Sequence, residues 1–240
     1  MKNNVKIVHI QIHVINKRRT IMEKKTVVYL IRHSEKTNQK EFIGTYNTKD
    51  NKQLITEKNM LTIRGEEKAR RLSEQEEFEN IDVVYSSNYA RAMQTAKYFV
   101  AKNNLKLNID ERFNERRKGN PDVEKYPNHF VMQYWDKDFK NPEGESQREV
   151  NKRMTEAFWE IVNENKNKKI VIVSHGTSIS FLLMNWCELI DVEQNFRRFL
   201  KFNGKELINR PYYSPEVFKL ILDEKNNIVD ISNVVFEDKI

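Results

Sequence analysis

Short apolar runs that stop abruptly at polar residues recur along the chain, with helically patterned segments between them. Three runs are rich in β-branched residues, which is typical of strands buried on both faces of a sheet: TVVYLIR (26–32), DVVYSS (82–87) and KKIVIVSH (168–175). Apolar residues three and four positions apart predict helices over three segments: 61–77, 89–103 and 148–165. These repeated units predict an α/β fold, a three-layer sandwich with a mostly parallel central sheet flanked by helices.

The segments around these units extend the pattern. Residues 105–110 alternate between apolar and polar as a strand does, and we interpret the apolar segment 178–190 as a buried helix. Two late runs, 217–223 and 227–236, predict strands that meet in a hairpin. The sheet is therefore expected to gain one or two antiparallel strands near the end of the chain. Thr62 is the expected N-cap of the first helix.

Charge is unevenly distributed along the chain. The 240 residues carry a net charge of +7, and residues 1–25 hold seven Lys or Arg against one Glu. The rest is nearly neutral, which argues against a nucleic-acid partner for the folded part. We expect a basic leader over 1–25, flexible or not translated, and a single domain over 26–240. Met22 offers a second site at which translation could start. The alternative to a dispensable leader is that residues 5–15 form an edge strand.

No stretch of the sequence approaches the roughly 20 apolar residues that a membrane span requires. The start also lacks the long apolar segment and cleavage site of a secretory signal. We therefore expect a soluble, cytoplasmic protein with no membrane partner. Its single cysteine, Cys187, cannot form an internal disulfide, and the apolar residues around it favour a buried structural thiol.

Two of the predicted buried strands end in a histidine. His33 follows LIR, and His175 follows IVS. The carboxyl ends of parallel strands lie at the same edge of a sheet, where sites form in α/β proteins, so we expect the two rings to meet there. A single histidine at a strand end is more often structural, but two at matched positions favour a functional site.

Six segments together resemble the histidine phosphatase superfamily, whose fold is like that of phosphoglycerate mutase. In chain order they are LIRHSEKT, LTIRGEEKA, DVVYSSNYARAMQTA, DERFNER, PEGES with the helix that follows it, and IVIVSHGTSI. The first resembles an Arg-His-Gly-Glu/Gln-Thr signature and the last a second His-Gly motif. The resemblance covers about residues 26–190, and the order of the motifs makes it specific.

The resemblance implies a role for each candidate residue. His33 would be the nucleophile that carries the phosphoryl group, and Arg32 and Arg91 would clamp its oxygens, because a guanidinium matches two oxygens at once. His175 would donate to the transferring phosphoryl group. Glu115 would protonate the leaving oxygen and then activate water. This chemistry implies neither a metal nor a cofactor.

Some of these assignments have alternatives. Glu111 lies in the same charged segment as Glu115 and is the second candidate for the acid. An isolated Arg91 would be read as part of a surface ion pair, but its place in SSNYARAMQTA favours the phosphate role. The alternative for Glu145 and Ser146 is that they cap the helix that follows.

The first motif also departs from the family pattern. Ser34 replaces the usual Gly and adds a side chain where the backbone approaches the phosphate, so its hydroxyl would clash or donate. Asn38 is a further candidate phosphate ligand, one position from the commonest spacing. The effect of both departures is left open by the sequence.

Hydrolysis of a small-molecule phosphate monoester is the favoured function. A cofactor-dependent phosphoglycerate mutase is the nearest alternative, but the stretches characteristic of mutases are not found here. A non-catalytic phosphate-binding module is a second alternative. Such a module would be expected to lack a histidine or an arginine of the pocket, and this chain has all four: Arg32, His33, Arg91 and His175. The physiological substrate and the oligomeric state are not determined by the sequence.

The segment 116–141 shows no clear period and is rich in aromatic residues. A long loop of this kind is often functional, and we expect most of its aromatics to pack, with Tyr134 or Trp135 forming a wall against the leaving group. Residues Arg116 to Lys118 would add positive potential at the mouth and favour substrates with a second anionic group; a solvated basic turn is the alternative.

Overall fold

The computed structural model describes residues 25–38 and 52–236. The leader, the proposed start at Met22 and the alternative strand over 5–15 therefore lie outside the described residues, apart from Lys25. A six-stranded sheet forms the centre, in the order β3-β2-β4-β1-β8-β9. Its members are β1 (Thr26–Arg32), β2 (Val83–Ser86), β3 (Leu107–Ile109), β4 (Lys169–Ser174), β8 (Glu216–Leu222) and β9 (Ile228–Asn233).

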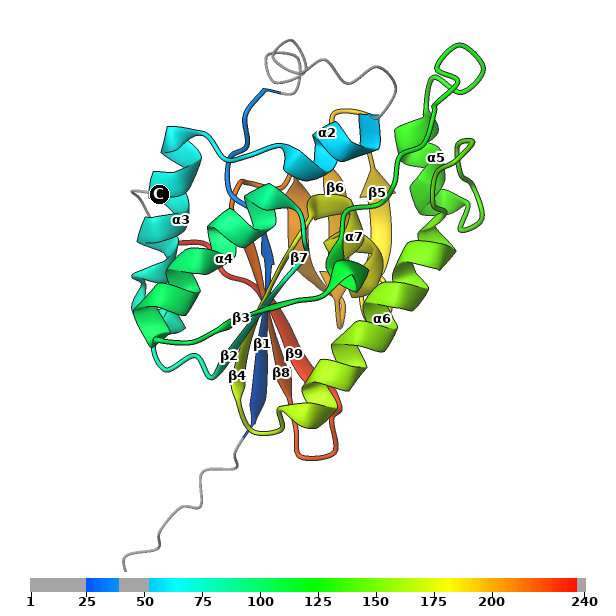
Figure 1. The fold of residues 1–240 in the computed structure, drawn as a ribbon. Helices are drawn as coiled ribbons and strands as arrows, with labels where there is room; N and C mark the ends of the chain where they lie inside the picture. The colour runs from blue at the N-terminus through cyan, green and yellow to red at the C-terminus, as the bar shows by residue number, and fades with distance from the viewer. Residues whose placement is uncertain (1–24, 39–51, 237–240) are drawn as a thin grey trace, which may run out of the picture.

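The first four strands of the sheet are parallel, and β8 and β9 are added as an antiparallel hairpin. Helices cover both faces (Figure 1). The longer ones are α3 (Ile63–Ser73), α4 (Ala90–Asn103), α6 (Gln147–Glu164) and α7 (Gly176–Leu183). The prediction of a three-layer α/β sandwich with a mostly parallel sheet is confirmed.

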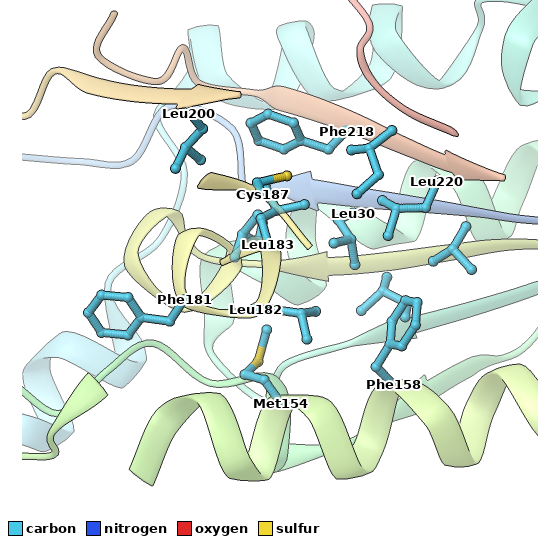
Figure 2. Packing of buried hydrophobic residues seen from close by; sticks show 14 of the residues in the cluster. Leu30, Met154, Phe158, Phe181, Leu182, Leu183, Cys187, Leu200, Phe218 and Leu220 are labelled. Atoms are coloured by element: carbon cyan, nitrogen blue, oxygen red, sulfur yellow. The ribbon is translucent and has the colours of Figure 1, made fainter. Parts of the chain in front are cut away.

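Each face of the sheet has its own apolar core, because successive strand residues point to opposite sides. Along β1, Val28 and Leu30 pack with α6 and α7, while Tyr29 and Ile31 pack with α3 and α4. Figure 2 shows the first of these cores, in which Met154 and Phe158 of α6 face the sheet. Cys187 is buried in the same core, which raises the pKa of its thiol to about 12 and fits the structural role expected for it.

The helices begin at the signals that the sequence contains. The Thr62 side chain accepts a hydrogen bond from the Gly65 amide, as expected of an N-cap. Ser146 caps α6 in a capping box with Glu149. Two shorter helices, α2 (Lys52–Lys58) and α5 (His129–Trp135), and two 3-10 turns, η1 (Glu76–Phe78) and η2 (Glu111–Phe113), complete the helical elements of the described ranges.

The helix predicted over 178–190 is wrong in its second half. Helix α7 ends at Leu183, and Glu188–Val192 forms β5, the first strand of a small antiparallel sheet with β6 (Arg198–Phe202) and β7 (Lys205–Arg210). The apolar residues after Leu183 satisfied a helical pattern, but the backbone of β5 pairs with β6 instead. Nor did the sequence reading predict α5, which lies within the segment 116–141. In the described part of the chain, no helix is both long and apolar enough to cross a membrane.

Candidate active site

His33 and His175 lie side by side where two neighbouring parallel strands end. Arg32, the last residue of β1, is in register with Ser174, the last residue of β4, and the His33 amide donates to the Ser174 carbonyl at 2.9 Å. The two imidazole rings are 5.2 Å apart between centroids and both are buried. The prediction that the two histidines meet at one edge of the sheet is therefore confirmed.

The His33 ring is held in its neutral form. Its Nδ1 atom is 2.7 Å from the carbonyl oxygen of Ser34, which can only accept, so the proton lies on Nδ1 and the lone pair on Nε2. Burial, followed by the positive charges of Arg91 and Arg32, holds the pKa of His33 well below its usual range. The ring therefore needs no base to expose its nucleophilic nitrogen.

His175 has hydrogen bonds at both ring nitrogens. Arg91 donates from Nη2 to Nδ1 at 3.1 Å, which places the proton on Nε2, and that nitrogen donates to the Ser87 hydroxyl at 2.7 Å. Burial and the charge of Arg91 hold the pKa of His175 well below its usual range. A donation from His175 to a phosphoryl group, as the resemblance implies, would require the Ser87 contact to be exchanged, and this role stays a prediction.

Arg32 and Arg91 are anchored through backbone carbonyls. Arg32 donates from Nη1 to the carbonyls of Tyr212 and Tyr213, and Arg91 donates to that of Thr56. The Nε atoms of both arginines are buried and have no hydrogen-bond partner among the described residues. Burial lowers the pKa of Arg91 to about 10 and lowers that of Arg32. Buried donors left unpartnered beside a neutral imidazole are suited to the oxygens of a bound anion.

Lys36 is a further cation of the site that the sequence reading missed. It is partly buried, forms an isolated bridge with Leu61, and lies where the family motif has threonine. Burial, together with the charges of Arg91 and Lys118, lowers its pKa to about 8. The sequence feature that could have identified Lys36 was its position within the motif LIRHSEKT. Asn38, the other candidate of this segment, is exposed, and its role as a phosphate ligand stays a prediction.

The carboxylate of Glu115 lies at the N-terminus of α7, directly after His175. One oxygen accepts from the Ser178 amide at 3.1 Å and the Arg116 amide at 2.9 Å, and the other faces the Thr177 amide at 3.4 Å. Glu111, by contrast, is exposed in η2. The structure thus places Glu115 beside the residues that follow His175 and within electrostatic reach of Arg32 and Arg91. The assignment of the acid itself stays a prediction.

Ser34 is accommodated without entering the pocket as a free hydroxyl. Its side chain donates to the Gly65 carbonyl at 2.7 Å, and its amide donates to the Thr95 hydroxyl at 3.0 Å. A Cβ atom at Gly65 would lie 2.0 Å from the Glu35 carbonyl oxygen. The first turn of α3 therefore packs directly on the loop that carries His33, and this requires glycine at position 65.

Glu145 supports the loop that carries Glu115. It binds Arg153 of α6 through both oxygens, and Arg153 also donates to the carbonyl of Asn114 at 2.9 Å. The proposed capping role therefore belongs to Ser146 alone. The expected basic mouth is only partly formed, because Arg116 is buried and donates to the Glu145 carbonyl, while Arg117 and Lys118 are exposed.

Tyr134, one of the two residues expected to form a wall against the leaving group, is a core residue. Its hydroxyl accepts a hydrogen bond from Arg198, and the centre of its ring is 5.0 Å from that of Phe181. Trp135 is 55% exposed.

Across the described ranges, no group of three His, Cys, Asp or Glu side chains is placed to hold a metal ion.

Comparison with solved structures reveals the same fold in several proteins, phosphatases among them. The Bacillus stearothermophilus protein YhfR is 21% identical, with a TM-score of 0.60, and 85% of this chain and 94% of that one are covered. The mycobacterial glucosyl-3-phosphoglycerate phosphatase in complex with inorganic phosphate is 16% identical, with a TM-score of 0.61 and 88% and 97% covered. A phosphoserine phosphatase variant from Entamoeba histolytica in complex with phosphoserine is 21% identical, with a TM-score of 0.55 and 86% and 96% covered.

A search of the curated proteins finds no match. The family model of the histidine phosphatase superfamily, branch 1, matches residues 28–203. This range holds the strand ends that carry both histidines, the helix that carries Arg91, and the loop that carries Glu115. Because the match covers well over half of the chain, the protein belongs to the histidine phosphatase superfamily, branch 1.

Proposed function

We propose that this protein is a phosphatase that hydrolyses small-molecule phosphate monoesters through a phosphohistidine on His33. The observation that carries the proposal is the neutral His33 ring, with its lone pair on Nε2, beside two arginines whose buried Nε atoms have no partner in the described part of the chain. A nucleophile and a cationic pocket for the phosphoryl oxygens are the two parts that such chemistry requires. The names of the similar solved proteins, a phosphoserine phosphatase among them, also support it.

In the first step, His33 Nε2 attacks phosphorus and forms the N–P bond while the bond from phosphorus to the ester oxygen breaks. Arg32 and Arg91 bind the phosphoryl oxygens, and Glu115, protonated at this stage, gives its proton to the leaving oxygen. In the second step, Glu115 takes a proton from water, which attacks phosphorus and breaks the N–P bond. Inorganic phosphate leaves, and His33 regains its neutral form. The cycle uses no metal or cofactor.

The phosphoenzyme tests this proposal directly. An aryl phosphate labelled at phosphorus should leave an acid-labile, alkali-stable label on the wild-type protein, and His33→Asn should abolish both the label and phosphate release. His129→Asn is the matched control, because His129 lies on α5, outside the site, and this variant should label as the wild type does. Turnover that survives in His33→Asn would refute the mechanism.

The same experiment separates the alternative functions. A mutase would form the label but release phosphate slowly and return it to an acceptor such as a phosphoglycerate. A phosphate-binding module would bind inorganic phosphate and form no label. Hydrolysis at a rate equal to label decay supports the phosphatase. We further propose that the protein acts in the cytoplasm, without a nucleic-acid or membrane partner.

A further inference from the structure

Arg198 is a buried cation beside the site that the proposed cycle does not use. It begins β6 in the small sheet, which lies next to α5 and α7 in Figure 1, and only 5% of its surface is exposed. Its guanidinium lies over three aromatic rings, 4.5 Å from the ring centre of Tyr212, 5.3 Å from Phe130 and 5.5 Å from Tyr134. Its Nε donates to the Tyr134 hydroxyl at 2.6 Å and its Nη1 to the Phe196 carbonyl at 3.0 Å.

No carboxylate among the described residues pairs with Arg198, and its Nη2 atom has no acceptor there. Arg197, the residue before it, binds both Asp191 and Glu193 and shows the usual arrangement. Arginine stays charged when it is buried, and a buried charge is costly unless an anion compensates it. The neutral oxygens of Tyr134 and Phe196 accept from two of the three guanidinium nitrogens, and aromatic rings cover its face. The third nitrogen, Nη2, can donate to an anion.

Tyr212 connects Arg198 to the phosphoryl pocket. The carbonyl of Tyr212 accepts from Arg32 at 2.7 Å, and its ring lies under the guanidinium of Arg198. A Cβ atom at Gly176, the residue after His175, would lie 3.7 Å from the Tyr212 ring and 3.4 Å from Arg32 Nε. Arg198 is therefore one side chain away from the Arg32 clamp.

Electrostatic effects agree with this placement. The charge of Arg198 is, after burial, the main cause that lowers the pKa of Arg32. Burial works against the charge of Arg198, but its neighbours, Glu115 among them, raise its pKa overall. Arg198 thus lies within electrostatic reach of both the proposed phosphate clamp and the proposed acid at the leaving oxygen.

We propose that Arg198 determines specificity by binding, through Nη2, a second anionic group carried by the leaving group of the substrate. The inference rests on the proposed function, because it takes the leaving oxygen to lie at Glu115. The substrate class is then phosphate monoesters that carry a carboxylate or a second phosphate near the ester oxygen. Nη2 can bind either a carboxylate or a phosphate, so the proposal concerns the negative charge of the leaving group. The test below distinguishes a carboxylate from a second phosphate.

Matched substrate pairs test this proposal. O-phosphoserine and O-phosphoethanolamine differ only in a carboxylate, and a hexose bisphosphate and the corresponding hexose monophosphate differ only in a second phosphate. In at least one pair the wild type should prefer the member with the extra anion. Arg198→Met should lower kcat/KM for that member by about 10- to 100-fold, mainly through KM, because a charge-assisted hydrogen bond is lost. The other member should change by less than about 3-fold.

The controls separate specificity from folding. Arg197→Met changes the adjacent arginine, which is already paired, and should leave the preference unchanged. Arg198→Lys should restore part of the preference, because it returns a positive charge to the position. If Arg198→Met fails to fold, Arg198→Gln keeps a donor toward the Tyr134 hydroxyl without the charge, and the same loss of preference is expected.

An equal loss on both members of every pair would overturn the proposal and make Arg198 a structural cation. The absence of any preference in the wild type would overturn it as well. Both outcomes leave the phosphatase intact. Failure of the proposed function gives a different result, because no phosphate would then be released from any substrate, an aryl phosphate included.

Discussion

The Nδ1 atom of His33 donates to the carbonyl of Ser34 over 2.7 Å, so a residue that departs from the family motif orients the His33 ring through its backbone. The Ser34 hydroxyl donates to Gly65 instead, at 2.7 Å. Any residue supplies a carbonyl, so the change from glycine to serine leaves the tautomer of His33 unaltered. The added hydroxyl strengthens the link between the loop and α3.

Neutral histidines are the first prediction. Burial and the nearby arginines hold the pKa of His33 and that of His175 well below 6.5, so both rings should be neutral at pH 7 and should gain a proton only well below pH 6.5. Histidine side-chain NMR signals, assigned with the His33→Asn and His175→Asn variants, report this directly. Addition of inorganic phosphate should raise both pKa values, because the anion offsets the arginine charges. A protonation midpoint at or above 6.5 in the free protein would contradict the prediction.

Lys36 should control phosphate affinity near pH 8. Its pKa of about 8 means that it is charged below that pH and loses its proton above it, so KM should rise as the pH rises through 8. Lys36→Met should raise KM by about 10-fold at pH 7 and remove this dependence on pH. Lys68→Met is the control, because Lys68 pairs with Glu35 at 3.4 Å. A KM that shows the same rise in Lys36→Met would assign the effect to another group.

The sequence predicted the parts of the site that lie at the ends of regular elements. Both histidines follow apolar strands, and parallel pairing of those strands fixes their separation, so a pattern of strands was enough to place them together. Glu115 was harder to place, because its position depends on a loop that Arg153 and Glu145 hold from a distant helix.

The missed features depend on contacts between distant segments. Arg198 lies over Tyr212, whose carbonyl accepts from Arg32, because β6 packs against α5. The sequence contained one local signal for the small sheet, the Asn203-Gly204 pair, which is typical of a tight hairpin. Both residues have positive φ in the turn between β6 and β7. The aromatic wall expected from Tyr134 fails for a related reason, since α5 turns that ring into the core.

Gly65→Ala should disturb the active-site loop. A Cβ atom there would lie 2.0 Å from the Glu35 carbonyl oxygen, so α3 or the loop must shift, at a cost of about 1 to 3 kcal/mol in the free energy of unfolding. Because that loop carries His33, kcat should fall as well. Gly204→Ala provides the comparison: its φ of 77° costs about 1 kcal/mol, but no atom lies within 4 Å of the new Cβ, so kcat should be unchanged. Urea unfolding and initial rates measure both quantities, and a normal kcat in Gly65→Ala would show that the loop tolerates the shift.

Glu115→Gln should separate the two steps of the cycle. A glutamine can still accept from the Ser178 amide through its oxygen, so the local structure should persist. It can neither give a proton to the leaving oxygen nor take one from water, so alkyl phosphate turnover should fall by about 10²- to 10⁴-fold. An aryl phosphate has a leaving group that needs little protonation, so its first step should continue while hydrolysis of the phosphoenzyme slows.

The phosphohistidine should therefore accumulate in Glu115→Gln with an aryl phosphate, as a burst of phenol followed by a slow steady state. Glu111→Gln is the matched control, because Glu111 lies in the same segment but is exposed, and this variant should show normal turnover without a burst. If Glu111→Gln accumulates the phosphoenzyme and Glu115→Gln does not, the acid is Glu111 and the contact of Glu115 with α7 is structural. If neither variant accumulates it, water is activated by a group other than these two carboxylates. The burst decides among these cases because it counts phosphoenzyme formed per protein molecule, a quantity that a general loss of stability would lower and could not raise.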